Sequence, residues 1–196
     1  MTIAFFGGTF NPPHNAHLAI ALLLRELFLP DKIILSVSRN PLKPDADISD
    51  DDRLAMTKLL ADEINATGEI AEVSDWELRR DAPSYAIETI THLEQVYPRA
   101  RWLWAIGDDN FRTFSQWKRY DEILRRVELV VFGRPNSNAP ADFAPPEGAK
   151  IHRVPLAMNV ASTELRQKLS QGIYPRSEMP ELILTYVKTR GLYRNA

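Results

Sequence analysis

Two histidines that follow a pair of glycines are the first residues in the chain whose types and spacing suggest chemistry. The segment reads Gly7-Gly8-Thr9-Phe10-Asn11-Pro12-Pro13-His14-Asn15-Ala16-His17. Adjacent glycines let a backbone turn sharply and approach a ligand closely. Side chains three residues apart share one face of a helix, so His14 and His17 can both face the same phosphate chain. The N–H groups at the start of that helix also favour an anion, so the segment predicts a phosphate-binding loop.

Two other interpretations of this segment stay open from the residues alone. The histidines can be a helix cap and an ordinary surface or core residue. An His-x-x-His zinc site also fits the spacing, although no third ligand is evident nearby. The segment is neither a G-x-G-x-x-G fingerprint nor a P-loop, so the common nucleotide motifs do not explain it.

A second candidate motif, Ser162-Thr163-Glu164-Leu165-Arg166, lies near the other end of the chain. We expect Ser162 and Thr163 to cap a helix and to offer hydrogen-bond donors. Arg166 follows one turn later and can hold phosphate oxygens. The alternative is a capped helix with one exposed arginine.

Short β-rich runs alternate with helical patterns along the whole chain. This alternation predicts an α/β fold with a Rossmann-like, doubly wound parallel sheet that is covered on both faces. In such sheets, ligands bind beyond the carboxyl ends of the strands, so the loops after Phe6, Ser38, Ile106 and Phe132 are the candidate site. We predict strands at 3–6, 32–38, 70–73, 101–106, 128–132 and 150–154, and helices at 16–29, 50–64, 84–97, 164–169 and 181–190.

Composition narrows the class of protein. The 196 residues fit one domain, 1–196, whose C-terminal helical part begins at about 162. The 24 basic and 26 acidic residues give a net charge of -2, which argues against a nucleic-acid polymer as partner. The chain has no cysteine, so it has no disulfide and no thiolate site. No run approaches the roughly 18 apolar residues of a membrane span, and no signal peptide is evident, so we expect a cytoplasmic protein.

The glycine-histidine segment resembles that of the nicotinate-nucleotide adenylyltransferases, within the nucleotidyltransferase superfamily marked by [T/H]-x-G-H after the first strand. The resemblance runs from residue 1 to 193, apart from a proline-rich stretch at 137–149. It implies transfer of the adenylyl group of ATP to nicotinate mononucleotide on the route to NAD. The products would be nicotinic acid adenine dinucleotide and pyrophosphate.

The same resemblance implies roles for individual residues. The catalytic residues would be His14, His17 and Arg166. Contacts to ATP would come from Gly7, Gly8, Thr9, Phe10, Gly107, Asp109, Ser162 and Thr163. Contacts to the mononucleotide would come from Asn40, Lys43, Ser84, Tyr85, Trp117 and Arg134. From the residues alone, Lys43 and Arg134 can also be ordinary loop residues, and Ser84 and Tyr85 can be a helix cap and a core residue.

Three positions depart from the family pattern: Ala16 replaces Gly, Ala86 replaces Thr, and Asp108 replaces Ala. We expect Mg²⁺ to come with ATP, held by phosphates and water, and expect no metal site in the protein itself. The alternatives are another acceptor, such as nicotinamide mononucleotide or phosphopantetheine, and a nucleotide-binding regulatory protein of the same fold. The oligomeric state is left open, a homo-oligomer included.

Overall fold

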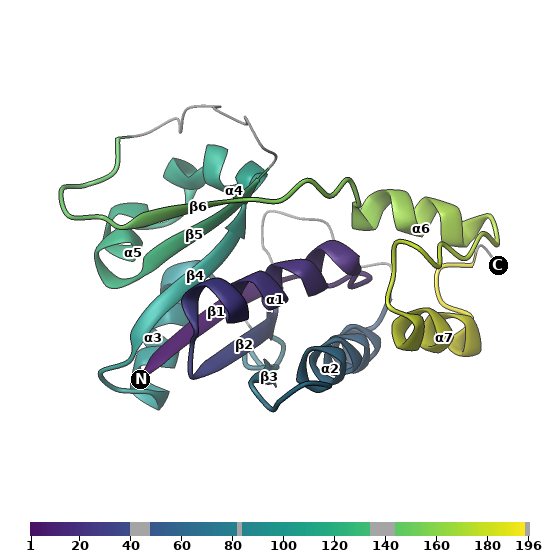
Figure 1. Ribbon diagram of the computed structural model, residues 1–196. Coiled ribbons are helices and arrows are strands. Elements are labelled where there is room, and N and C mark those ends of the chain that lie inside the picture. The colour runs from purple at the N-terminus through teal and green to yellow at the C-terminus, as the bar shows by residue number, and fades with distance from the viewer. Residues whose placement is uncertain (40–47, 82–83, 134–143, 195–196) are drawn as a thin grey trace.

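The computed structural model describes residues 1–39, 48–81, 84–133 and 144–194, and a parallel sheet of six strands forms its centre (Figure 1). The strand order is β3-β2-β1-β4-β5-β6, and every neighbouring pair is parallel. This order confirms the doubly wound fold and places the switch point between β1 and β4. The strands are β1 Thr2–Gly8, β2 Lys32–Val37, β3 Ala71–Ser74, β4 Arg101–Gly107, β5 Glu128–Gly133 and β6 Ile151–Pro155.

Helices cover both faces of the sheet (Figure 1). One face carries α1 Asn15–Phe28 and α2 Asp50–Asn65, together with the C-terminal helices α6 Ser162–Ser170 and α7 Glu181–Arg190. The other face carries α3 Ala86–Val96, α4 Asp108–Arg112 and α5 Tyr120–Arg126, with a 3₁₀ turn at Phe114–Gln116. Within the described ranges, no helix is long and apolar enough to cross a membrane.

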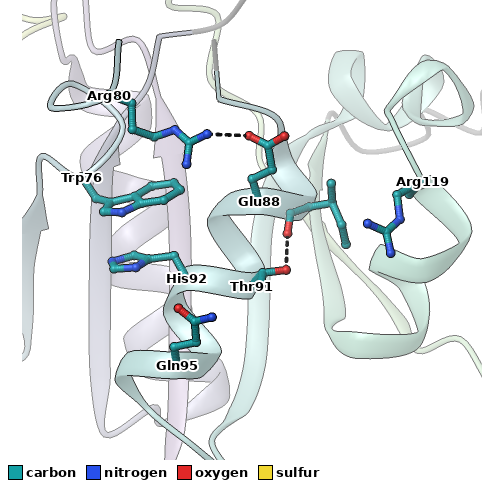
Figure 2. Close-up of a pocket in the computed structure, with 8 residues that line it drawn as sticks. Trp76, Arg80, Glu88, Thr91, His92, Gln95 and Arg119 are labelled. Atoms are coloured by element: carbon teal, nitrogen blue, oxygen red, sulfur yellow. Dashed lines mark hydrogen bonds and ion pairs between the residues drawn. The ribbon is translucent and has the colours of Figure 1, made fainter. Parts of the chain in front are cut away.

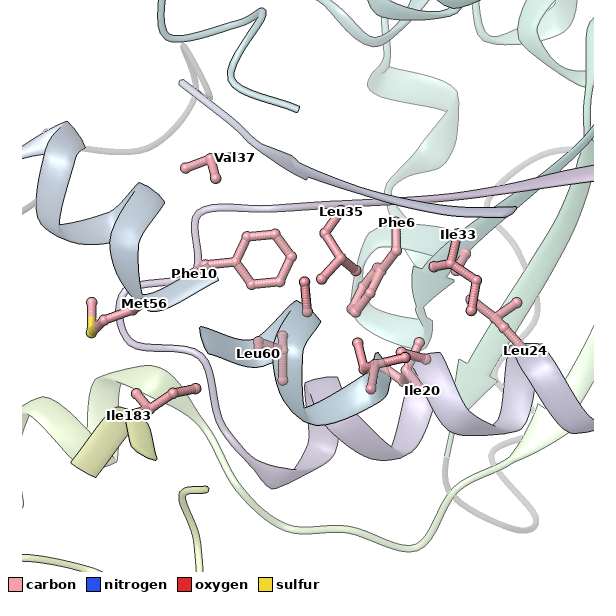
Figure 3. Close-up of a cluster of buried hydrophobic side chains, with 14 of the residues drawn as sticks. Phe6, Phe10, Ile20, Leu24, Ile33, Leu35, Val37, Met56, Leu60 and Ile183 are labelled. Carbon is pink, nitrogen blue, oxygen red and sulfur yellow. The ribbon is translucent and has the colours of Figure 1, made fainter. Parts of the chain in front are cut away.

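The alternation of side chains along the strands separates two hydrophobic cores. Phe6 of β1 faces the core on the α1 side, which Figure 3 shows with Met56 of α2 and Ile183 of α7. Ile3 and Phe5 face the opposite core. Trp102 and Trp104 of β4 lie in that second core and are buried, as their spacing of two predicts.

The first strand does not stop at its glycines. Gly7 and Gly8 continue β1 because they pair with Ser36 and Val37 of β2. The residue of the loop that adopts the left-handed backbone conformation is Phe10, with φ 46°. A Cβ on Gly8 would lie 3.2 Å from the Phe10 ring. The expected sharp turn at the glycines is therefore wrong, and Gly8 instead leaves room for the ring of Phe10.

Two predicted helix caps are also wrong. Helix α3 begins at Ala86 after an N-cap at Tyr85, so Ser84 lies before the cap and its hydroxyl caps nothing. Helix α6 begins at Ser162 after an N-cap at Ala161, and that N-cap makes no side-chain hydrogen bond. Tertiary contacts use these hydroxyls differently, as the site shows. Helices α4 and α5 were not predicted because their 5 and 7 residues are too short for a helical period to stand out.

Helices α1 and α7 bury narrower faces than the sequence predicts. The sequence from 16 to 29 is apolar nearly all round except at Arg25 and Glu26, which predicts a buried helix. In α1, however, Leu27 is largely exposed, because the helix packs on one face of the sheet only. On α7 the sequence pattern predicts an apolar stripe of Leu182, Ile183, Tyr186 and Val187. Leu182, however, is 49% exposed, whereas its neighbour Ile183 is fully buried. Leu184, outside the predicted stripe, is buried instead.

The neighbouring pair on α7 gives a direct test of this packing. Ile183→Ala is expected to lower the free energy of unfolding by about 2–5 kcal/mol, because it leaves a cavity in the core. Leu182→Ala, the matched control, is expected to change it by no more than about 0.5 kcal/mol. Urea unfolding of both variants measures the difference, and equal losses would contradict the placement of α7.

Candidate active site

The loop between β1 and α1 is held by side chains that come from distant parts of the chain. Its backbone carbonyls accept hydrogen bonds from Arg166 Nη1 at Asn11 (2.9 Å), from Ser162 Oγ at Pro12 (3.0 Å) and from Arg53 Nη1 at Thr9 (2.9 Å). The two motifs singled out from the sequence, 7–17 and 162–166, therefore meet at the carboxyl end of β1. Ser162 contributes by fixing the loop and not by capping its own helix.

The two histidines lie face to face, as expected for neighbours on one side of a helix. Their ring centroids are 3.7 Å apart, with 27° between the ring planes. The backbone N–H of His14 donates to His17 Nδ1 at 3.1 Å. An acceptor Nδ1 places the ring proton of a neutral imidazole on Nε2, so the hydrogen-bond pattern assigns His17 an Nε2–H donor.

The rings of Phe6 and Phe10 position the imidazole of His17. Their centroids lie 5.8 Å and 5.2 Å from the His17 centroid. Phe10 as a whole is only 1% exposed, and its ring packs in the core beside His17. Gly7 and Gly8 lie in the same segment, at the end of the strand that the loop leaves.

His14 is an uncharged residue at neutral pH. Burial lowers its pKa from 6.5 to about 4, and the nearby Glu178 carboxylate opposes this shift only in part. Its Nδ1 is buried without a hydrogen-bond partner among the described residues. Positive charge at the loop therefore comes from the guanidiniums of Arg53 and Arg166. Arg166 Nη2 also lies 3.5 Å from Thr163 Oγ1.

At the end of β4, Gly107 and Asp109 lie one strand away from the histidine loop, because β1 and β4 are paired. A Cβ on Gly107 would meet nothing within 4 Å, so the surface there is open. Asp109 is exposed on the first turn of α4. The unusual Asp108 is buried beside it, and its carboxylate pairs with Arg112 (2.8 Å) and Arg153 (3.7 Å). The extra charge at 108 thus has a structural partner on each side.

The structure brings the segment 84–85 close to the segment 117–118. Lys118 Nζ lies 4.2 Å from the centroid of the Tyr85 ring. Trp117 is half-buried and packs edge-on against Trp104, with centroids 6.0 Å apart. Ser84 Oγ is buried with no partner in the described part of the chain. Asn40, Lys43 and Arg134 lie outside the described residues.

A cleft of about 450 Å³ lies along α3 and contains none of the predicted site residues (Figure 2). Its wall is the ring of Trp76, which stacks on His92 (4.4 Å between centroids) and has Arg80 over its other face (4.6 Å).

In the described ranges, no three His, Asp or Glu side chains are grouped as for a metal ion. The two loop histidines therefore gain no third ligand there.

Comparison with known proteins assigns the family. A family model described as cytidylyltransferase-like matches residues 5–168. Proteins of Chloroherpeton thalassium and Prosthecochloris aestuarii are 44% and 46% identical to the chain, each over 98% of both chains, and both are named "Probable nicotinate-nucleotide adenylyltransferase". The chain belongs to the nicotinate-nucleotide adenylyltransferase family. It is therefore a nucleotidyltransferase, as the motifs predicted.

Solved structures agree on the fold of this family. Plasmodium falciparum nicotinic acid mononucleotide adenylyltransferase complexed with NaAD is 15% identical, with a TM-score of 0.78 over 98% of this chain and 97% of that one. The same protein complexed with APC has a TM-score of 0.75, over 98% of this chain and 96% of that one.

Sequence reasoning missed three residues that build this adenylyltransferase loop. Tyr193 donates from its hydroxyl to Asn11 Oδ1 at 2.7 Å, and Asn15 Nδ2 donates to the carbonyl of Ser177 at 2.9 Å. Arg53 bonds the loop from α2. Only Arg53 gave a usable signal, since it falls on the same helical stripe as the buried residues 56, 57, 60 and 64. The acidic composition of 45–52 predicts a solvated loop, but Asp52 lies in α2, is buried and accepts a hydrogen bond from the Tyr186 hydroxyl at 2.8 Å.

The low pKa of His14 predicts a loss of stability in acid. The unfolded chain binds a proton at His14 near pH 6.5, whereas the folded chain binds it only near pH 4. Acidification across this window therefore favours the unfolded state, by roughly 3 kcal/mol at pH 4. The stability advantage of the natural protein over His14→Gln is expected to shrink by this amount between pH 7 and pH 4.

Urea unfolding at several pH values measures this difference. The comparison with the variant is needed because Glu77 changes in the opposite direction, since burial raises its pKa to about 7. That contribution is present in both proteins and cancels. A difference that does not vary with pH would show that His14 is not buried in the neutral form.

Proposed function

We propose that this chain transfers the adenylyl group of ATP to nicotinate mononucleotide, forming nicotinic acid adenine dinucleotide and pyrophosphate. The observation that carries the proposal is the meeting of the stacked His14–His17 pair with Arg166 at the carboxyl end of β1. The names of relatives that match nearly the whole chain support the same acceptor.

The reaction needs no nucleophile from the protein. A phosphate oxygen of the mononucleotide attacks the α-phosphorus of ATP in line, a new P–O bond forms, and the bond to the β-phosphate breaks to release pyrophosphate. The attacking group is already an anion, so catalysis consists of positioning and charge stabilisation. The His17 Nε2–H donates to an α-phosphate oxygen, and His14 orients the phosphate chain.

The leaving pyrophosphate is held by Arg166 and the start of α6. A guanidinium offers donors in the fork geometry that suits phosphate oxygens. The hydroxyl of Thr163 and the N–H groups of the first turn of α6 add further donors, since the first N–H groups of a helix have no partner within it. Ser162 contributes by its bond to the Pro12 carbonyl.

The mononucleotide, which accepts the adenylyl group, lies toward α3. The backbone N–H groups near Ser84 and Tyr85 bind the nicotinate carboxylate at the start of α3, where the helix dipole favours negative charge. Trp117 offers a face for the pyridine ring. Gly107 and Asp109 contact the ribose and adenine of ATP. Asn40, Lys43 and Arg134 line the mononucleotide, as the family resemblance implies.

Magnesium enters this proposal as part of the co-substrate. The described surroundings of the phosphate loop are imidazoles, hydroxyls and guanidiniums, with the Glu178 carboxylate near His14, and no three His, Asp or Glu side chains among them are grouped to hold a cation. We expect Mg²⁺ to be held by ATP phosphates and water. A single domain at 1–196 with a helical part from about 162, a cytoplasmic location and any homo-oligomer stay predictions from the sequence.

The acceptor is tested by pyrophosphate release from Mg-ATP. Nicotinate mononucleotide, nicotinamide mononucleotide and phosphopantetheine are compared at equal concentrations. We expect strong preference for the nicotinate form, because the backbone N–H groups before α3 favour a negatively charged carboxylate over a neutral carboxamide. Equal rates with the first two would refute the proposed selectivity. ATP binding without pyrophosphate release would instead favour a nucleotide-binding regulatory protein.

The role of His17 is tested by substitution. His17→Ala is expected to reduce kcat by about 10²–10³-fold, as for loss of one hydrogen bond to a developing charge. His92→Ala is the matched control, because His92 lies in the separate cleft along α3. It is expected to keep a near-normal rate. A folded His17→Ala protein with the natural kcat would remove His17 from the mechanism.

A further inference from the structure

Arg53 on α2 is a buried arginine that joins two loops of the site. It is only 3% exposed. Its Nη1 donates to the backbone carbonyl of Thr9 at 2.9 Å and to that of Ser38 at 2.8 Å. Thr9 follows β1 and Ser38 follows β2, and these strands are neighbours in the sheet. One guanidinium nitrogen therefore holds together the first residues of both loops.

A second arginine extends this connection to β3. Asp50 lies one turn before Arg53 on α2, and its Oδ1 accepts a hydrogen bond from Arg53 Nη2. Its Oδ2 accepts one from Arg39 Nε at 2.8 Å, and Arg39 Nη1 donates to the carbonyl of Arg80 at 3.1 Å. Arg80 follows β3. The hydrogen-bonded series Arg53–Asp50–Arg39 thus links the loops that follow three adjacent strands.

The Asp50 carboxylate lies between the two guanidiniums of this series, those of Arg53 and Arg39. Although burial alone raises the pKa of the Asp50 carboxyl, hydrogen bonds from Arg53 and Arg39 lower it overall. Asp50 is therefore an anion at neutral pH, and it compensates the buried charge of Arg53. A lysine cannot replace this arrangement, because a single ammonium lacks the planar fork that reaches a carboxylate and two carbonyls together.

We propose that Arg53 is a positioning residue for adenylyl transfer, which sets the spacing between the histidine loop behind β1 and the loop behind β2. The inference rests on the proposed function, in which the first loop holds ATP and the second lies on the mononucleotide side. In-line attack depends on the distance between the two substrates. A displacement of about 1 Å can cost about 10²-fold in rate, even when each substrate still binds.

The test compares Arg53→Lys with Arg25→Lys. Arg25 lies in the last turn of α1, and its Nη1 donates to the carbonyl of Ile64 (3.3 Å) and to Thr67 Oγ1 (2.8 Å). It is thus a matched arginine that joins elements away from the site. We expect Arg53→Lys to lower kcat by about 10–100-fold, with the KM for ATP and for nicotinate mononucleotide each within about threefold. Arg25→Lys is expected to retain the natural kcat.

Hydrogen exchange gives a readout that does not need activity. The Ser38 N–H donates to the Gly8 carbonyl at 2.9 Å, so its protection reports the contact between the two loops. This amide is expected to exchange faster in Arg53→Lys and to be unchanged in Arg25→Lys. If Arg53→Lys does not fold, Asp50→Asn serves as the second variant, with the same expected pattern.

The outcomes separate this inference from the proposed function. Unchanged protection at Ser38 overturns the positioning role whatever the activity. Faster exchange with natural kcat, or with a loss confined to KM, also overturns it. Faster exchange in a protein whose natural form releases no pyrophosphate with nicotinate mononucleotide supports the loop spacing and refutes the proposed function alone.

Discussion

The capture of backbone carbonyls in the loop behind β1 is the constraint on which the rest of the site depends. The backbone carbonyls of Thr9, Asn11 and Pro12 accept hydrogen bonds from Arg53, Arg166 and Ser162, respectively. Carbonyl oxygens facing a phosphate would repel it. In the proposed function, turning them toward donors from α2 and α6 leaves the imidazoles to face the phosphates. The same bonds make the histidine pair depend on distant parts of the chain.

The electrostatics of the site follow from this arrangement. His14 is buried deeply enough to stay neutral, and the hydrogen bond at His17 Nδ1 fixes a single tautomer. In the proposed function, two neutral imidazoles therefore donate hydrogen bonds to the phosphates without adding charge beside the core. The permanent charge comes from Arg166 in α6, since the charge of Arg53 is compensated by Asp50. Neutral imidazoles at one end and a charged guanidinium at the other suit a reaction in which negative charge moves from the α-phosphate toward a departing pyrophosphate.

Two of the three departures from the family pattern have a structural explanation. Ala16 lies on the buried face of α1. Asp108 is buried, pairs with the exposed Arg112 and approaches Arg153 of β6. Gly133 leaves the space that the Asp108 side chain needs, since a Cβ on Gly133 would lie 2.9 Å from the Cβ of Asp108. Nothing in the structure explains Ala86. The charge at 108 therefore connects the ends of β4 and β6 and is not itself evidence of a lost activity.

The sequence by itself determined the fold and the two ends of the site. Alternating strands and helices predicted the doubly wound sheet because hydrophobic periodicity is a local property of the chain. The motifs at 7–17 and 162–166 were recognisable because each keeps its residues within one turn or loop. The same locality explains the errors: the strand running through Gly8, the missed helices α4 and α5, and the caps assigned to Ser84 and Ser162.

Only the tertiary structure decided what those residues contact. Ser162 bonds a carbonyl 150 residues away, and Tyr193 bonds the side chain of Asn11. Whether Arg53 reaches solvent or two buried carbonyls is set by where β1 and β2 place their ends. Such contacts depend on the relative positions of separate elements, which no local pattern encodes, so the sequence named the chemical groups and the packing fixed their geometry.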